Sequence, residues 1–332
     1  MSIKRIQQMT GFSYSTISRV LNGKAQEFRI SDKTRQAILK AAEALNYRPN
    51  ILARSLRLRR THTVGLIVPD IQNPFFGELA SRIEKLLREQ GYSTILCNTN
   101  EIPENEEFYL KVLVDRQVDG IIIAPIHTKE WDAMEEIRRE RSIVLIDRIF
   151  YETDIPWVTS ANEQAAEDLT NELIGIGYKR IAFLGGTAET YINSMRYAGY
   201  RKALARHGLP ADNRNVFFEG YSPEAGERMM DTLLRLEPDA EAVLCVNNLV
   251  FIGAMKTVQK HESEAPGRSI MMAAFDIDRY CEIFKRPLLC AKQDQEKLAS
   301  NAVALLIKGI QNTIGPDRHL VVPMSIGRHR IR

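Results

Sequence analysis

The fold of the N-terminal region is decided by one stretch, GFSYSTISRVLNG, at residues 11–23. Gly11 breaks a preceding helix and permits positive φ, and Ser13 can cap the helix that follows. Ile17, Val20 and Leu21 are spaced for one apolar face of that helix, which the pair Asn22-Gly23 would end. This stretch therefore predicts a tight turn followed by a short helix.

The neighbouring residues extend this pattern to three helices. Upstream, the apolar residues Ile3, Ile6 and Met9 share one helical face. Downstream, Ser31 can cap a third helix that ends at Tyr47-Arg48-Pro49 and places inward the residues Ile38, Leu39, Ala42 and Leu45. Three short helices with a glycine turn between the first two form the helix-turn-helix arrangement. We predict an all-α helix-turn-helix domain at residues 1–49, followed at 50–61 by a helix too short to be stable without a partner.

After residue 62 short apolar runs alternate with amphipathic stretches. The predicted strands of a first series are 64–69, 93–97, 120–124 and 143–147, with helices at 75–90, 104–117 and 129–141. The strands of a second series are 180–184, 216–219, 242–246, 271–275 and 288–291, with helices at 161–176, 193–207, 222–236, 248–261 and 295–311. This alternation favours an α/β fold with parallel sheets in two similar lobes, which would leave a cleft between them.

Charge is divided unevenly along the 332 residues, although the net charge is only +3. Residues 1–62 hold 13 Lys and Arg against three acids, whereas the remainder holds 32 against 39. Such a split indicates a basic module for a polyanion joined to a body that does not bind one. Basic segments also serve RNA and anionic lipid, so charge alone leaves the partner open.

Composition argues against several classes of protein. No apolar run is long enough to span a bilayer, and no apolar signal-peptide core follows Met1, so we expect a cytoplasmic protein without a membrane partner. Cys97, Cys245, Cys281 and Cys290 are far apart and are expected to be free, buried thiols. The six histidines lack the spacing of metal ligands, and no catalytic arrangement is suggested, so we expect no metal, no cofactor and no enzyme.

The second helix of a helix-turn-helix lies in the major groove of DNA, where its first residues meet base edges. Here these residues are Tyr14, Ser15 and Thr16, followed one turn later by Ser18 and Arg19. Arginine is the usual bidentate partner of guanine, which makes Arg19 the best candidate base reader, with a phosphate contact as the alternative. The residues expected to position the DNA backbone are Ser2, Thr10, Ser13, Thr16 and Asn22.

Together with these residues, ordered motifs along nearly the whole chain resemble the LacI/GalR family of bacterial repressors. The motifs are residues 11–23, 31–35, 46–50, 53–56, 63–70, 73–76, 118–122, 145–148, 195–200 and 274–276. The longer insert at 23–30 looks like the fructose-repressor and sucrose-repressor branch. The resemblance implies a hinge helix at Asn50–Leu58 that pairs in the minor groove, with contacts from Asn50 and Ala53. Leu56 would be the apolar wedge that kinks the duplex, against the alternative of an ordinary packing leucine.

For residues 62–332 the resemblance implies a type I periplasmic-binding-protein fold that binds an effector and dimerises. The N-lobe would comprise about 62–160 and 292–320, and the C-lobe about 161–291 and 321–332. The implied effector residues are Asp70, Asn73, Phe75, Phe76, Asp147, Arg148, Arg196, Asn248 and Asp276. Carboxylates, amides, aromatic rings and an arginine are what a sugar site requires.

Two departures from the family pattern make the cleft less anionic: Ala161 replaces a frequent Asp, and Asn247-Asn248 a frequent Asn-Asp. With Arg148, Arg196 and Lys292 nearby, the effector is expected to be a sugar or a phosphorylated or acidic sugar. Gly185-Gly186-Thr187 could hold an anion but is interpreted as a strand-to-helix turn.

We therefore expect a ligand-responsive repressor of carbohydrate genes that binds a pseudo-palindromic double-stranded operator as a homodimer or higher assembly. A solute-binding or sugar-active protein on the same scaffold is the alternative, and residues 1–60 argue against it. A third reading, an architectural DNA protein without ligand control, leaves the effector residues without a role.

Overall fold

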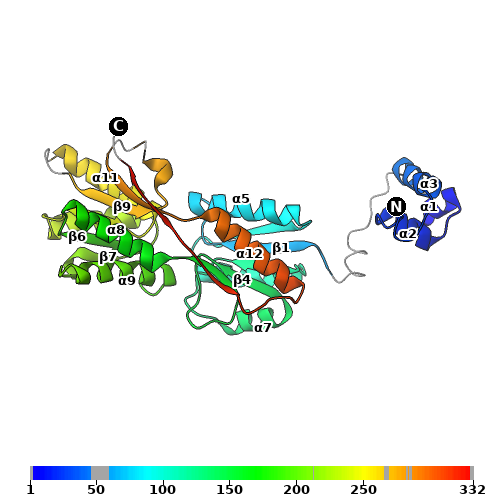
Figure 1. Cartoon of the computed structure of the whole chain (residues 1–332), viewed down its shortest axis with the longest axis horizontal. Helices are drawn as coiled ribbons and strands as arrows, with labels where there is room; N and C mark the ends of the chain where they lie inside the picture. Colours follow the sequence, from blue (N-terminus) through cyan, green and yellow to red (C-terminus); the bar gives the residue numbers. More distant parts are fainter. Residues whose placement is uncertain are drawn as a thin grey trace. The chain divides into compact units, whose positions relative to one another are not determined.

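The computed structural model describes residues 3–45, 60–211, 213–264, 269–281, 283 and 286–329. The chain forms two compact units, Met1–Thr61 and His62–Arg332, which are described separately (Figure 1). Four predicted DNA-contacting residues and most of the predicted hinge helix lie outside the described residues; the four are Ser2, Asn50, Ala53 and Leu56.

The first unit, called the head here, is built from three helices, α1 (Ile3–Thr10), α2 (Tyr14–Leu21) and α3 (Asp32–Ala44). Ser13 and Ser31 cap α2 and α3 as predicted, because their hydroxyls accept hydrogen bonds from Thr16 N (3.2 Å) and Thr34 N (3.3 Å). Gly11 adopts φ 73°, which the turn between α1 and α2 requires. The core of the head comprises Ile6, Ile17, Val20, Ala25, Ile38, Ala41 and Ala42.

The prediction that Leu39 points inward is wrong. Its side chain is 44% exposed, because α3 packs on the other helices through Ile38, Ala41 and Ala42 and Leu39 lies to one side of that narrow face. Met9, which was predicted to share one helical face with Ile3 and Ile6, is also exposed. With only three short helices, the head buries one row of side chains per helix, so neighbouring apolar positions stay in water.

The second unit, called the body, contains two six-stranded sheets. The N-lobe is built on the sheet of order β11-β5-β4-β3-β1-β2, whose neighbouring strands are all parallel. Its strands are β1 (Thr63–Val68), β2 (Ser93–Asn98), β3 (Gly120–Ile123), β4 (Ser142–Ile146), β5 (Trp157–Ser160) and β11 (His319–Val322). The C-lobe sheet has the order β12-β10-β9-β8-β6-β7, and only its pair β10–β12 is antiparallel. Its strands are β6 (Ile181–Gly185), β7 (Val216–Phe218), β8 (Ala242–Cys245), β9 (Met271–Phe275), β10 (Leu288–Lys292) and β12 (Ser325–His329).

Helices cover both faces of each sheet, as parallel strands require. In the N-lobe, α5 (Pro74–Glu89) and α12 (Gln295–Ile310) pack on one face, while α6 (Pro103–Asp115) and α7 (Asp132–Glu140) pack on the other (Figure 1). The C-lobe helices are α8 (Asn162–Ile176), α9 (Tyr191–Arg206), α10 (Pro223–Leu236) and α11 (Asn248–Glu264), with short 3-10 turns η1 (Asn213–Asn215) and η2 (Asp278–Tyr280). The predicted α/β alternation is thus confirmed.

Three strands were not predicted from the sequence: β5, β11 and β12. Strands β11 and β12 lie at sheet edges with mostly exposed or half-buried residues, so they lack the continuous apolar run of a central parallel strand. They follow each other directly, and this C-terminal segment runs along both lobes (Figure 1).

The described chain crosses between the lobes at three places, and polar contacts tie the crossings together. They lie at Ala161, at Gln293-Asp294 and at Pro323-Met324. Ala161 N donates to the carbonyl of Val322 (2.9 Å), and the Ser160 hydroxyl donates to Oε1 of Gln293 (2.6 Å). The Gln293 side chain is buried although it is polar, which fixes the crossings relative to one another.

Candidate functional site

The start of α2 presents a polar, exposed surface on the head. Tyr14 is 58% exposed, and Ser15 is also exposed. The hydroxyl of Ser13 lies 2.9 Å from that of Ser15 and 2.9 Å from that of Thr16. Ser13 and Thr16, predicted as DNA contacts, thus also hold the helix N-cap.

The end of α2 is held by Asn22, whose Nδ2 donates to the carbonyl of Ser18 (2.6 Å) and lies 3.3 Å from its hydroxyl. Arg19 is exposed, and its guanidinium lies over the ring of Phe28 at 4.0 Å from the centroid. Phe28 belongs to the insert that follows α2 and was not singled out in the sequence. The ring limits the conformations of the arginine without removing it from water.

In the body, a cleft of about 490 Å³ is lined by residues of both lobes. All nine predicted effector residues line it: Asp70, Asn73, Phe75, Phe76, Asp147, Arg148, Arg196, Asn248 and Asp276. Most come from the carboxyl ends of parallel strands or the helix starts that follow, which is where α/β folds place ligands. Lys292 does not line this cleft: it pairs with Asp278 (2.6 Å) and borders an adjoining cavity that shares Phe75 and Asp276 with the cleft.

Arg196, on α9, is a buried cation at one wall of the cleft. Its Nε donates to Oδ1 of Asn162 (2.8 Å), one of its terminal nitrogens donates to the carbonyl of Val246 (2.5 Å), and its guanidinium lies 3.7 Å from the ring centroid of Phe275. Burial lowers the pKa of this guanidinium, although Asp276 and Asp147 act in the opposite sense. The side chain is therefore locked in place by the protein before any ligand binds.

Asp147 and Asp276 face Arg196 from the two lobes, and both adopt positive φ (64° and 56°) directly after a strand. Asp276 accepts hydrogen bonds from the backbone N (3.0 Å) and Nε2 (2.7 Å) of Gln293. Within the described residues, Oδ1 of Asp147 is buried and has no hydrogen-bond partner. Burial raises the pKa of Asp147 to about 6 against the opposing effect of Arg196 and Arg148. This oxygen can accept a hydrogen bond from a ligand in the cleft.

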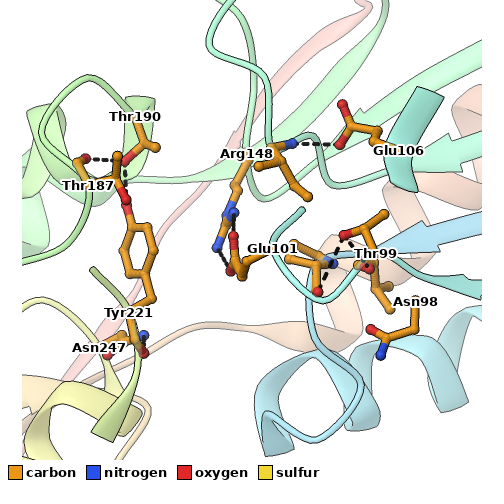
Figure 2. A network of polar contacts seen from close by, with 12 residues as sticks. Asn98, Thr99, Glu101, Glu106, Arg148, Thr187, Thr190, Tyr221 and Asn247 are labelled. Carbon is orange, nitrogen blue, oxygen red and sulfur yellow. Dashed lines mark hydrogen bonds and ion pairs between the residues drawn. The ribbon is translucent and has the colours of Figure 1, made fainter. Parts of the chain in front are cut away.

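Arg148 is held by Glu101, which was not predicted as a site residue. Two terminal nitrogens of Arg148 donate to the two carboxylate oxygens of Glu101 (2.8 and 2.6 Å), as Figure 2 shows. The guanidinium also lies near the rings of Tyr221 (4.9 Å) and Phe76 (5.7 Å). Burial alone would lower the pKa of Arg148, but the carboxylate of Glu101 outweighs it and the pKa is raised.

Tyr221 forms a second wall that the sequence did not reveal. Its hydroxyl is hydrogen-bonded to that of Thr190, which in turn donates to the carbonyl of Thr187 (2.8 Å; Figure 2). A Cβ on Gly186 would lie 2.2 Å from the Tyr221 ring, so only glycine fits there. Gly186 N donates to Oδ1 of Asn193 (2.9 Å), and this agrees with a strand-to-helix turn rather than an anion loop.

The two lobes also touch across the cleft through amides. Asn248 Nδ2 donates to Oδ1 of Asn73 (3.0 Å), and the same oxygen accepts from Phe75 N (3.1 Å) at the start of α5. Asp70 accepts from Gln72 N (2.9 Å) in the preceding turn. Asn248, which stands where the family often has Asp, thus bridges the lobes. Asn247 caps α11, because its Oδ1 accepts a hydrogen bond from Val250 N (2.8 Å).

The part of the chain that is described contains no group of three or more His, Cys, Asp or Glu arranged to hold a metal ion. All four cysteines are free and buried, as predicted. None of the described helices is both long and apolar enough to cross a membrane.

A helix-turn-helix head joined to a two-lobed body with a polar cleft defines a ligand-responsive DNA-binding protein. Comparison with family models agrees. Residues 2–50 match the model of bacterial regulatory proteins, lacI family, and residues 61–276 match that of periplasmic binding proteins and the sugar binding domain of the LacI family. The chain belongs to the LacI family of transcriptional regulators.

Individual relatives cover nearly the whole chain. The HTH-type transcriptional regulator RegA of Clostridium saccharobutylicum is 32% identical over 311 residues, 92% of each chain. Catabolite control protein A of Priestia megaterium is 32% identical over 309 residues, again 92% of each. The fold is also similar to a lac repressor dimer solved with operator and an anti-inducer, with a TM-score of 0.85, 21% identity and coverage of 100% of this chain and 99% of that one.

Proposed function

We propose that this regulator is a repressor of carbohydrate-utilisation genes, and that a sugar or sugar phosphate in the cleft controls its binding to a pseudo-palindromic operator as a homodimer. The observation that carries the proposal is the cleft itself, because acceptors, donors and aromatic rings from both lobes converge on one space of about 490 Å³. That volume suits a small ligand, and the mixture of groups suits hydroxyls and a sugar ring face.

In the operator complex, Tyr14, Ser15 and Arg19 would meet base edges in the major groove, since they are the exposed residues at the start and along one side of α2. Ser18 would lie beside Arg19 one turn further on, and the phosphate backbone would be positioned by Ser2, Thr10, Ser13, Thr16 and Asn22. Asn50, Ala53 and Leu56 are proposed to act in the minor groove, with Leu56 as the wedge.

Control by the ligand is proposed to run through the lobe crossings. Arg196 holds Asn162, whose Nδ2 donates to the carbonyl of Ser160 (3.0 Å), and Ser160 contacts Gln293, which donates to Asp276. A ligand that contacts both Arg196 and Asp276 would therefore act on the hydrogen bonds that hold the crossings at Ala161 and at Gln293-Asp294. The ligand shifts the lobe arrangement only by the difference in its affinity for the two arrangements.

The test measures operator binding and ligand binding on one full-length sample. A DNA site is first selected from a random library, and binding is then followed by fluorescence anisotropy with and without each member of a panel of sugars and sugar phosphates. We expect at least one compound to change the operator affinity. Specific DNA binding that no member of the panel alters would contradict the proposed control.

A further inference from the structure

The charged groups that line the cleft are paired in a way that bears on the class of ligand. Five acids and three arginines line it among the described residues: Asp70, Glu101, Asp147, Glu219 and Asp276 with Arg148, Arg196 and Arg228. Because carboxylates outnumber guanidinium groups, the cleft is more anionic than Ala161 and Asn248 alone indicate.

Each arginine already faces a carboxylate. Glu101 binds both terminal nitrogens of Arg148, Glu219 accepts from Nε of Arg228 (2.8 Å), and Arg196 lies opposite Asp147 and Asp276. Arg228 and Glu219 are exposed, but Arg148 and Arg196 are buried. A phosphate at the buried arginines would have to displace their carboxylates or lie beside them, and both cost free energy. An uncharged hydroxyl has no such conflict, since it can accept from an arginine and donate to a carboxylate at the same time.

Asp147 adds an independent observation. Its side chain is 5% exposed, and Oδ1 lacks a hydrogen-bond partner within the described chain. A buried acceptor without a partner calls for a ligand group that donates a hydrogen bond. Sugar hydroxyls supply such donors with or without a phosphate, so Asp147 points to a polyhydroxylated ligand, and the choice against phosphate rests on the paired arginines.

A turn with unusual backbone geometry places Glu101 at the cleft. It follows β2 with φ 57°, directly after Asn100 at φ 54°, and its backbone N donates to the carbonyl of Pro69 (3.0 Å). Two successive non-glycine residues at positive φ are rare and cost free energy, so the surrounding structure must hold this turn in place. Here it directs the carboxylate to the guanidinium of Arg148.

From these contacts we propose that the cleft takes an uncharged, polyhydroxylated ligand, and that Glu101 determines this preference by occupying the guanidinium of Arg148. The proposal rests on the proposed sugar-responsive function and narrows it to unphosphorylated sugars. Glu101 acts as a specificity-determining residue, because it penalises the charged competitor rather than adding a contact to the preferred ligand.

The test uses calorimetry on the full-length protein with matched pairs: fructose and fructose 1-phosphate, glucose and glucose 6-phosphate, ribose and ribose 5-phosphate, with cellobiose in addition. For wild type, at least one free sugar should bind about tenfold or more tightly than its phosphate. In Glu101→Gln, which keeps the side-chain size, that ratio should fall by about tenfold as Arg148 becomes available to phosphate.

Two further variants separate charge from folding. Glu104→Gln makes the same charge change at an exposed position of α6 that does not line the cleft, and its ratio should equal that of wild type. The double variant Glu101→Gln/Arg148→Met should lose the phosphate binding gained by Glu101→Gln. A thermal melt of each variant checks that it is folded, and the wild-type ratio stands without any variant.

The outcomes are distinct. A wild-type preference for a phosphate over its free sugar overturns the ligand class but leaves the proposed sugar-responsive function intact. An unchanged ratio in folded Glu101→Gln overturns the role of Glu101. Silence of wild type across the whole panel overturns the proposed function, and with it this inference.

Discussion

Arg19 in the head and Arg148 in the body differ in burial and in how their charge is compensated. Both lie against an aromatic ring, Phe28 in one case and Tyr221 in the other. Arg148 is buried and neutralised by Glu101, whereas Arg19 is exposed and, in the described head, has no carboxylate partner. Arg19 is proposed to read DNA, and a residue in that role must keep its charge available for its partner. A charged residue inside a cleft must instead be compensated before the ligand arrives.

The largest effect is expected where the cleft loses a compensating charge. Arg196→Ala leaves Asp147 and Asp276 facing each other in a buried site and should lower the free energy of unfolding by about 3–5 kcal/mol. Arg201→Ala, at an exposed position on the same helix where, among the described residues, the guanidinium contacts only the ring of Tyr197, is the matched control and should cost no more than about 1 kcal/mol. Chemical denaturation of the full chain measures both, and similar values for the two variants would break the comparison.

In the head the same kind of change should act on DNA recognition and not on folding. Arg19→Ala should cost about 1–3 kcal/mol of operator affinity at one base-pair position and relax the preference there, with ligand affinity unchanged. Anisotropy with operators substituted one base pair at a time measures this. Lys24→Ala, an exposed residue after α2, serves as control. An equal loss on every operator would demote Arg19 to a phosphate contact.

Phe28 should matter less, because it only orients Arg19. Phe28→Ala should weaken operator binding by about 0.5–1 kcal/mol, the range of an exposed cation–π contact, while Phe28→Tyr keeps the ring and the affinity. Thermal melts of the head region should move little, since Phe28 is 42% exposed. If Phe28→Tyr weakens binding as much as Phe28→Ala, the ring is not what orients Arg19.

The smallest effect concerns pH. His127 Nδ1 lies 2.9 Å from Oε1 of the buried Glu106, its ring stacks on Trp131, and Glu107 and Glu104 are also near. The hydrogen bond with Glu106 raises the pKa of His127 above its ordinary 6.5, although burial opposes this. The stabilisation is therefore fully present below pH 6.5 and is lost as pH rises through the raised pKa. The difference in melting temperature between wild type and His127→Gln should shrink from pH 6 to pH 9. A difference that grows over this range would contradict the stabilising contribution of protonated His127.

Much of the fold could be predicted because its signals are local. Ser13 and Ser31 indicate helix starts because they are capping residues, and apolar runs such as residues 120–123 predict buried parallel strands. Strands β11 and β12 gave no such signal, since an edge strand is stabilised by its neighbours more than by its own pattern. Leu39 shows the opposite error, an apolar residue at a helical spacing that the packing does not use.

The cleft was predictable in its residues from resemblance but not in its pairing. Glu101 and Arg148 are 47 positions apart, and nothing in their surroundings links them until β2 and β4 are placed in one sheet. A usable signal did exist: residues 99–101 follow β2 directly, so their polar side chains gather with those after the other parallel strands. Tyr221 carried a weaker signal, because it precedes the start of α10 rather than following a buried run.

The C-terminal segment has a consequence for how the chain is made. The N-lobe core includes Leu298 and Leu306 of α12, and one of the two edge strands of its sheet, β11, ends at Val322. A ribosome releases residues in order, so strands β1 to β5 leave the exit tunnel long before α12 and β11 exist. All of the C-lobe except β12 is synthesised in between, and until α12 follows, the sheet face that α5 and α12 share is covered by α5 alone. The nascent chain should therefore depend on chaperones most strongly in this interval. The head should not depend on them, because its three helices α1 to α3 end at Ala44.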